Sequence, residues 1–204
     1  MIFNLTNGLI LLSSYFVGSI PFGLLITRVA GEGDIRAIGS GNIGATNVLR
    51  TGKKLLAILT LFFDFFKGWC MVFLAKKYGI EAWAAMLVVL GHMFPLWLKF
   101  KGGKGVATYA GVLMALSIPL GVQAILGWVA FLVIFRYSSL AALLVSLLVP
   151  LSVWVWHYEG LLPITLLLSA LVGLKHRDNI QRLWKGEEPK VGKGGSTANT
   201  AKKS

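Results

Sequence analysis

Long apolar stretches alternate with short, polar and basic segments along almost the whole chain. Each apolar stretch is long enough, or nearly long enough, to cross the hydrocarbon core of a bilayer as a helix. The pattern therefore predicts an all-α integral membrane protein with short broken helices and glycine-rich loops. The expected spans lie at residues 5–27, 55–75, 82–98, 106–118, 122–135, 140–156 and 161–174.

The first stretch is expected to be a retained span rather than a cleaved signal peptide, because no basic segment precedes it while Arg28 follows it. Pro21 lies between Ser19 and Gly23 and is expected to kink this span, since proline removes a backbone donor. Arg28 then marks the cytoplasmic end of the span, which leaves the N-terminus outside.

The stretches at 106–118 and 122–135 are short, so hydropathy alone leaves open one long helix or two short ones. The distribution of charged residues favours two short helices. With seven crossings, 17 of the 20 Lys and Arg residues lie on one side, against Lys76 and Lys77 on the other and Lys67 within a span. Six crossings would export the basic C-terminal segment, although basic loops tend to stay cytoplasmic. We therefore expect about seven transmembrane helices, with the N-terminus outside and the C-terminus cytoplasmic.

Composition supports this class and sets the domain count. The 204 residues are 56% hydrophobic with a mean hydropathy of +0.74, and only 14% are charged. Soluble domains have roughly 25% charged residues. We expect a single transmembrane domain over residues 1–188, followed by a disordered basic tail over 189–204 that is rich in Lys, Gly, Ser and Thr.

The net charge of +12 would suggest nucleic acid in a soluble protein, but here the basic residues flank apolar spans. We attribute the charge to membrane orientation and anionic lipid head groups, and we expect no nucleic-acid partner. The lone Cys70 excludes an intramolecular disulfide. His92, His157 and His176 show no metal-ligand spacing, so neither a metal nor a cofactor is expected.

Three polar, glycine-rich islands interrupt the apolar pattern, and the expected topology places all three on the cytoplasmic side. The first island, residues 39–47, has the glycine spacing of a dinucleotide-binding loop, but a transmembrane stretch follows it and no strand precedes it. One interpretation is a hydrated connector. The alternative is phosphate binding by its small polar side chains and the next arginine, namely Ser40, Asn42, Thr46, Asn47 and Arg50.

The second island, residues 100–108, superficially resembles a Walker loop but lacks the required upstream glycine and the required Ser or Thr. Gly102 and Gly103 are still expected to present free backbone N–H groups at the start of a helix, where an anion is favoured. Lys104 adds a mobile positive charge. Lys101 is either a further phosphate ligand or an anchor at the membrane surface.

The third island, residues 175–182, is typical of a helix that lies at the membrane surface. His176 and Asn179 are three residues apart and hence share one face of that helix. An imidazole beside an amide is suited to hydrogen-bond a substrate hydroxyl or phosphate. The alternative is two solvated polar residues on an amphipathic helix.

A carrier of phosphorylated solutes is the alternative class of protein, since it would also place charges among membrane helices. Asp64 and Lys67 are such charges, and their spacing within one span predicts that they pair with each other or face a polar cavity. No inverted repeat is visible. The islands also lie at one surface rather than at mid-membrane, which favours an enzyme.

The islands carry three motifs in a fixed order. They are Gly-Ser-Gly-Asn-Ile-Gly-Ala-Thr-Asn at 39–47 with Arg50, Gly-His-Met-Phe-Pro at 91–95 leading to Phe-Lys-Gly-Gly-Lys-Gly-Val-Ala-Thr at 100–108, and His-Arg-x-Asn-Ile-x-Arg-Leu at 176–183 with Gly186 and Glu187. Together with the segments around Asp64 and Arg136-Tyr-Ser-Ser139, they closely resemble the bacterial membrane acyl-phosphate:glycerol-3-phosphate acyltransferase family. The resemblance covers about residues 10–188.

The resemblance implies transfer of a fatty acyl group from acyl phosphate to the 1-hydroxyl of sn-glycerol 3-phosphate. The products would be lysophosphatidic acid and phosphate, and the reaction would be the first acylation step of phospholipid synthesis. The resemblance also implies that the protein lies in the bacterial inner membrane with its active site facing the cytoplasm. The implied partners are acyl phosphate, glycerol 3-phosphate and membrane lipids. By resemblance, the active-site positions are Ser40, Arg50, Lys104, Ser139, His176 and Asn179, with Asn42, Gly102 and Gly103 as further candidates.

The leaving group suggests the mechanism. An acyl phosphate is already an activated mixed anhydride, so the protein mainly has to position two anionic substrates and neutralise their charge. We expect the implied arginine and lysine to supply that charge. Donors from Ser40, Ser139 and Asn179 are expected to orient the hydroxyl and the developing oxyanion, while a substrate phosphate or His176 accepts the proton.

Overall fold

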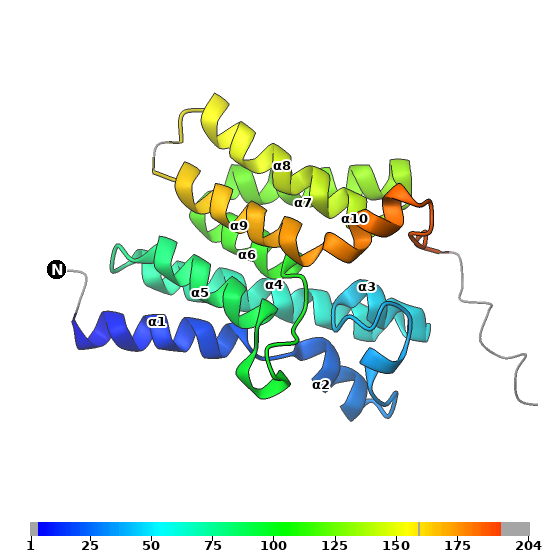
Figure 1. Cartoon of the computed structure of the whole chain (residues 1–204). Coiled ribbons are helices and arrows are strands. Elements are labelled where there is room, and N and C mark those ends of the chain that lie inside the picture. The colour runs from blue at the N-terminus through cyan, green and yellow to red at the C-terminus, as the bar shows by residue number, and fades with distance from the viewer. Residues whose placement is uncertain (1–3, 159, 193–204) are drawn as a thin grey trace, which may run out of the picture.

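The computed structural model describes residues 4–158 and 160–192, and every regular element in that part of the chain is helical (Figure 1). The all-α class expected from the sequence is therefore confirmed for the described residues. The α-helices are α1 (Leu5–Gly18), α2 (Phe22–Val29), α3 (Ala45–Val48), α4 (Lys54–Lys76), α5 (Glu81–Met93), α6 (Val106–Leu116), α7 (Ile118–Phe135), α8 (Ser138–Val155), α9 (Leu162–Lys175) and α10 (Arg177–Trp184). Three 3-10 turns join them, η1 (Ile35–Ala37), η2 (Leu49–Thr51) and η3 (Leu96–Leu98).

Among the described residues, four helical segments are long and apolar enough to cross a membrane: α4, α7, α8 and Glu81–Leu98, which contains α5 and η3. The bent pair α1 and α2 adds a fifth if it is counted as one span. Helices α6 and α9 are apolar but have only 11 and 14 residues. Such lengths cover roughly 16 to 21 Å of a hydrocarbon core about 30 Å thick. The structure thus supports a multi-span membrane protein, and the number of seven crossings stays a prediction.

The first expected span is bent where Pro21 predicts a kink. Helix α1 ends at Gly18, α2 begins at Phe22, and the two helices differ in direction by 49°. At the break the carbonyl of Ile20 lies outside the regular helical ladder and accepts the N–H of Phe22 over 3.1 Å. The Nζ of Lys67 donates a hydrogen bond to this carbonyl over 2.9 Å.

The apolar region 106–135 forms two helices, as the charge pattern favours. An extended residue, Ser117, with φ −154° and ψ 118°, separates α6 from α7. Helix α7 then approaches α6 so closely that a Cβ on Gly121 would collide with the backbone of Met114. A single long helix is therefore excluded for this region.

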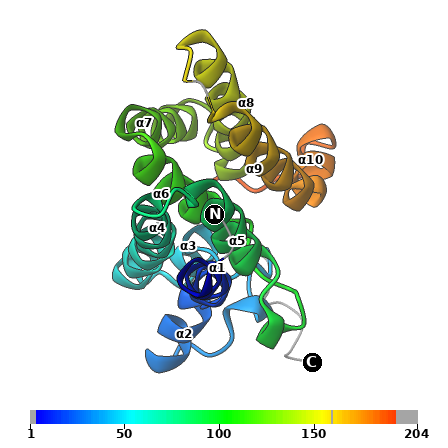
Figure 2. The same ribbon diagram turned by 90° about the vertical axis from the view of Figure 1, so that its left-hand side faces the viewer.

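Viewed along the bundle, α1, α4 and α5 lie on one side and α7, α8 and α9 on the other, with α6 between them (Figure 2). Helices α4 and α6 are in close contact, since a Cβ on Gly68 or Gly111 would collide with backbone of the facing helix. Apolar side chains such as Val88, Leu113 and Leu168 fill the core where the two sides meet. Only 17% of the 18-residue apolar stretch of α7 is buried inside the protein, so this helix offers a broad apolar surface to lipid.

Helices α3 and α10, which belong to the first and third islands, lie to the right in Figure 1, and the second island, in the connection between α5 and α6, meets α10 through the bond from Lys104 to Asn179. The turn between α4 and α5, which follows Lys76, lies at the opposite end (Figure 1). This separation agrees with the expected placement of the islands on one face. That the face is cytoplasmic stays a prediction.

The tail predicted over 189–204 is described only as far as residue 192, and the predicted disorder of 193–204 lies outside the described residues. The described part runs beside the connection between α7 and α8. Val191 donates its N–H to the carbonyl of Arg136 over 2.8 Å, and the Nζ of Lys190 lies 5.4 Å from the ring centroid of Tyr137. The boundary between domain and tail stays a prediction.

Candidate active site

The first island is organised around the buried side chain of Asn47. Its Nδ2 donates to the carbonyls of Ile35, Ile38 and Asn42 over 3.0, 3.1 and 2.8 Å. Its Oδ1 accepts the N–H of Ser40 over 3.1 Å and lies 3.4 Å from the Ser40 hydroxyl. The amide of Asn47 therefore holds the loop that presents Ser40. Its predicted contact with phosphate stays a prediction.

The other polar side chains of this island differ in the contacts that they make within the protein. The Oδ1 of Asn42 accepts the N–H of Ile43 over 2.9 Å. The hydroxyl of Thr46 is 3.1 Å from that of Ser138, which ties the island to the start of α8. Arg50 is exposed, crosses over Gly39, and has no carboxylate within ion-pair distance among the described residues. Its guanidinium is therefore available to an incoming anion.

The second island differs from the sequence-based expectation. Gly102 donates its N–H to the carbonyl of Met93 over 3.2 Å, and Gly103 donates to the carbonyl of His92 over 3.1 Å. The expectation that these two N–H groups are free at the start of α6 is therefore wrong, because the loop folds back on the end of α5. Lys101 is exposed, whereas Lys104 is partly buried.

The third island places its predicted polar residues inside the structure, so two solvated residues on an amphipathic helix are excluded. His176 and Asn179 are 2% and 4% exposed. The Nδ1 of His176 is 2.8 Å from the carbonyl of Val172, and that contact fixes the ring at the junction between α9 and α10. Asn179, on α10, accepts a hydrogen bond from the Nζ of Lys104 over 2.5 Å. The second and third islands thus meet through this bond.

A carboxylate, Glu188, joins these donors and was not expected from the sequence. Its Oε1 accepts hydrogen bonds from the hydroxyl of Ser139 and the Nδ2 of Asn179, each over 2.6 Å. Its Oε2 accepts from the Nε of Arg182 over 2.8 Å. The family resemblance extends to about residue 188, and the place of Glu188 at the end of that region was the only feature of the sequence that could have pointed to it. Ser139, Asn179 and Arg182 can therefore surround one anionic group.

The charges of the site influence one another. Burial lowers the pKa of Lys104 to about 8, although the nearby carboxylate of Glu188 opposes the shift. The positive charges of Arg182 and Arg50 also lower it, so Arg50 lies within electrostatic range of Lys104. Burial raises the pKa of Glu188, but the hydrogen bonds from Ser139, Asn179 and Arg182 outweigh burial and lower it overall. Glu188 is thus an anion at neutral pH.

His176 is neutral at physiological pH. Burial lowers its pKa to about 4, and the charge of Lys104 adds to the effect. With Nδ1–H donated to the carbonyl of Val172, the other ring nitrogen, Nε2, is an acceptor. The imidazole is therefore suited to accept a hydrogen bond from a hydroxyl, and it is a weak base.

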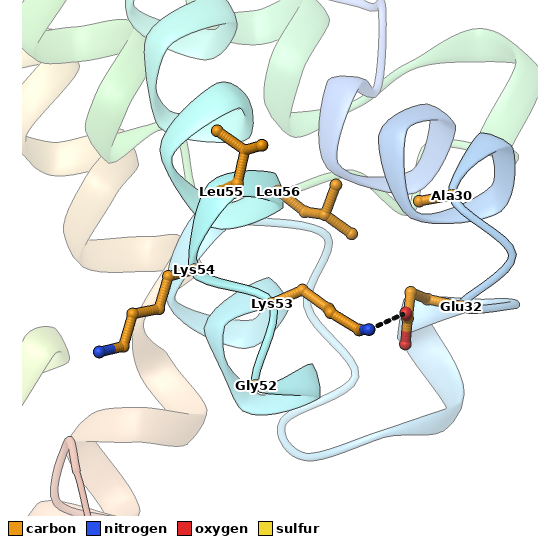
Figure 3. Close-up of a pocket in the computed structure, with 7 residues that line it drawn as sticks. All are labelled: Ala30, Glu32, Gly52, Lys53, Lys54, Leu55 and Leu56. Atoms are coloured by element: carbon orange, nitrogen blue, oxygen red, sulfur yellow. Dashed lines mark ion pairs between the residues drawn. The ribbon is translucent and has the colours of Figure 1, made fainter.

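The structure brings Lys104, Ser139, His176 and Asn179 together, with Ser40 and Arg50 on the neighbouring loop. Within residues 4–158 and 160–192, no group of three ligating side chains is suited to a metal ion. A surface groove between α2 and the start of α4 lies apart from these residues (Figure 3). It contains the ion pair of Lys53 with Glu32, whose Nζ and Oε1 are 3.7 Å apart, and none of the predicted site residues lines it.

Comparisons with known proteins agree with the geometry. The family described as "Glycerol-3-phosphate acyltransferase" matches residues 8–186. The glycerol-3-phosphate acyltransferase of Brucella anthropi is 50% identical over 184 residues, which cover 89% of this chain and 92% of the relative. That of Mesorhizobium japonicum is 50% identical over 192 residues, or 92% of this chain and 98% of the relative.

The fold matches that of a solved membrane enzyme. The crystal structure of PlsY (YgiH), an integral membrane glycerol 3-phosphate acyltransferase, in its glycerol 3-phosphate form superposes with a TM-score of 0.86 at 38% identity. The match covers 90% of this chain and 94% of that chain. The lysophosphatidic acid form gives a TM-score of 0.83 at 37% identity. The chain therefore belongs to the glycerol-3-phosphate acyltransferase family, and it is a membrane enzyme.

Proposed function

We propose that this acyltransferase takes its acyl group from an acyl phosphate and transfers it to the 1-hydroxyl of glycerol 3-phosphate. The products are lysophosphatidic acid and inorganic phosphate. The observation that carries the proposal is the convergence of Lys104, Ser139 and Asn179 around one carboxylate, with Arg50 close by. Two substrates that each carry a phosphate require such cations and donors in one place. The transporter alternative is not needed for a member of an acyltransferase family.

The chemistry requires one bond to form and one to break. The 1-hydroxyl oxygen attacks the acyl carbonyl carbon, and the bond from that carbon to the phosphate oxygen breaks as phosphate leaves. Arg50 and Lys104 neutralise the phosphates, while Ser40, Ser139 and Asn179 orient the hydroxyl and the oxyanion. Asn42, Thr46 and Lys101 complete the substrate-binding surface, and Asn47, Gly102 and Gly103, whose polar groups bond within the protein, hold the loops that form it.

The hydroxyl proton goes to a phosphate rather than to the protein. His176, with a pKa of about 4, would hold a proton poorly at neutral pH. A phosphate monoester takes up its second proton near pH 6, so a substrate phosphate is the stronger base of the two. His176 accepts a hydrogen bond from that hydroxyl and orients it.

The donor is tested directly with purified protein in detergent. Acyl phosphate and glycerol 3-phosphate together should release inorganic phosphate, and either substrate alone should not. The matched control supplies the same acyl chain as a coenzyme A thioester, which should give no turnover. Turnover with the thioester and none with acyl phosphate would refute the proposed donor.

We also propose that seven segments cross the bacterial inner membrane, with the N-terminus outside and the islands facing the cytoplasm. The placement of nearly all basic loops at the island end supports this orientation. Cysteines in place of Glu187 and Tyr78, introduced separately into a Cys70→Ala background, lie at opposite ends of the bundle and are exposed. A membrane-impermeant thiol reagent added to intact cells should label only the cysteine at position 78. Labelling at position 187 would refute the orientation.

A further inference from the structure

A buried polar cluster lies inside the helix bundle, outside the site described above. Asp64 and Lys67 of α4 are each 3% exposed, and the Nζ of Lys67 is 2.7 Å from Oδ1 of Asp64. His92 of α5 brings its Nδ1 to 3.5 Å from the same Oδ1. The hydroxyl of Thr108 on α6 is 3.3 Å from that Nδ1. The cluster therefore ties together three helices.

Net stability is a poor explanation for such a cluster. Two charges lose their hydration on burial, and their mutual attraction offsets this loss only when further hydrogen bonds complete the arrangement. Within a membrane bundle, ionisable side chains are costly and commonly serve function. The arrangement of the neighbouring backbone indicates which function.

One end of the cluster is anchored to the break in the first span. Lys67 donates to the carbonyl of Ile20, between α1 and α2, over 2.9 Å. Its Nζ also lies 5.5 Å from the ring centroid of Phe22. The ion pair is thus fixed at its base, and Asp64 is held in a set position facing His92.

The other end of the cluster supports the glycine loop. A Cβ on Gly103 would collide with Nε2, Cε1 and Cδ2 of His92, so the loop backbone rests on the outer edge of the imidazole. Gly103 also donates its N–H to the carbonyl of His92 over 3.1 Å. The next residue is Lys104, whose Nζ is bound by Asn179 over 2.5 Å.

We infer that His92, held by Asp64 and Lys67, is a positioning residue whose ring sets the height of the Gly103 backbone and hence the place of Lys104. The imidazole cannot swing aside, because Asp64 and Thr108 hold its Nδ1 and the bundle buries it. A shift of about 1 Å in a group that positions a substrate can lower the rate about 100-fold. The inference rests on the proposed place of Lys104 and the glycine loop in the active site.

Steric complementation tests this contact. Gly103→Ala should lower kcat/KM for glycerol 3-phosphate acylation about 100-fold, since the new methyl group meets the ring. Neither Gly103 nor Gly102 has a left-handed φ, so alanine strains neither backbone. His92→Asn keeps an amide near the Nδ1 position but removes the Nε2 edge. The double variant His92→Asn with Gly103→Ala should recover at least about tenfold over Gly103→Ala, as expected for residues in contact.

Gly102 provides the matched control. A Cβ there would meet the carbonyl oxygen of His92 and the ring of Pro95, neither of which changes in His92→Asn. His92→Asn should therefore leave the defect of Gly102→Ala unrelieved. If His92→Asn does not purify as a folded protein, His92→Ala, which also removes the ring, replaces it in both pairs.

The outcomes separate this inference from the site assignment. Folded Gly103→Ala protein that stays equally impaired with and without the His92 change would overturn the role of His92, as would equal recovery of Gly102→Ala. Lys104→Ala is measured in parallel. Near-normal activity of Lys104→Ala would instead show that the glycine loop lies outside the active site. Thermal unfolding midpoints identify any variant whose loss comes from unfolding.

Discussion

The two cationic loops at the island end of the bundle are built in opposite ways. Arg50 lies within the short 3-10 turn η2, is exposed, and has no carboxylate partner among the described residues. Lys104 is partly buried and is already bound by Asn179, within range of Glu188. One cation is free to move toward a ligand, whereas the other is placed in advance. The difference suggests that substrate ordering occurs mainly on the Arg50 side.

The largest expected effects come from removing either cation. Arg50→Ala and Lys104→Ala should each lower kcat/KM by about 100- to 1,000-fold, the usual loss for one preorganised charge-stabilising group. Arg50→Ala should leave the thermal unfolding midpoint unchanged, since it breaks no ion pair of the described protein. Lys77→Ala, at the opposite end, is the control and should keep normal activity. Near-normal rates for Arg50→Ala would show that the exposed Arg50 does not bind substrate, so that it could not be contrasted with Lys104 as a second cation of the site.

Replacing Glu188 with Gln should affect both stability and pH dependence. The donors from Ser139, Asn179 and Arg182 would lose their anion, at a cost of about 1–3 kcal/mol. Glu188 raises the pKa of Lys104, so its removal should lower that pKa below its value of about 8.

Activity that needs protonated Lys104 is present below its pKa and is lost as pH rises through it. The alkaline limb of the kcat/KM profile should therefore move to lower pH in Glu188→Gln. A limb that stays in place would show that Lys104 does not titrate in the free enzyme.

Ser139→Ala should have a smaller effect, which a double-mutant cycle can assign. If the hydroxyl acts only through Glu188, Ser139→Ala should cost about tenfold or less in the wild type and almost nothing in the Glu188→Gln background. If the hydroxyl contacts substrate, as proposed, the loss should persist in both backgrounds. Kinetic constants for the four proteins decide between these roles.

The smallest expected effect concerns His176. Because its pKa is about 4, the imidazole is neutral throughout the range above pH 5, and its own titration should give no acidic limb there. Any limb near pH 6 should follow the substrate phosphate and shift when a phosphonate analogue replaces glycerol 3-phosphate. A limb that is unaffected by the analogue and absent in His176→Asn would identify His176 as the proton acceptor.

Local patterns predicted much of the fold. The kink at Pro21 appears where the sequence places it, because proline acts on the backbone of its own segment. The division of the region 106–135 also appears, but at Ser117 rather than between residues 118 and 122, since Pro119 is accommodated in the first turn of α7. The pairing of Asp64 with Lys67 also follows from i,i+3 spacing on one helix. These features depend on residues that are close in the chain.

The sequence was a poorer guide to which polar groups already have hydrogen-bond partners within the protein. The N–H groups of Gly102 and Gly103 are engaged by α5, and the amide of Asn47 is engaged by its own loop. Glu188 meets Ser139 across 49 positions of sequence. No pattern of neighbouring residue types reveals such contacts, since they depend on how the helices are packed.

The sequence by itself determined the membrane class, the three islands and the identity of their polar residues, because hydrophobic length, glycine and charge act locally. Tertiary structure alone decided that Lys104, Ser139, Asn179 and Glu188 form one cluster and that the ring of His92 supports Gly103. The physical reason is that burial and hydrogen-bond partners, which set the pKa of Lys104 and the available donors, exist only once distant segments are packed together.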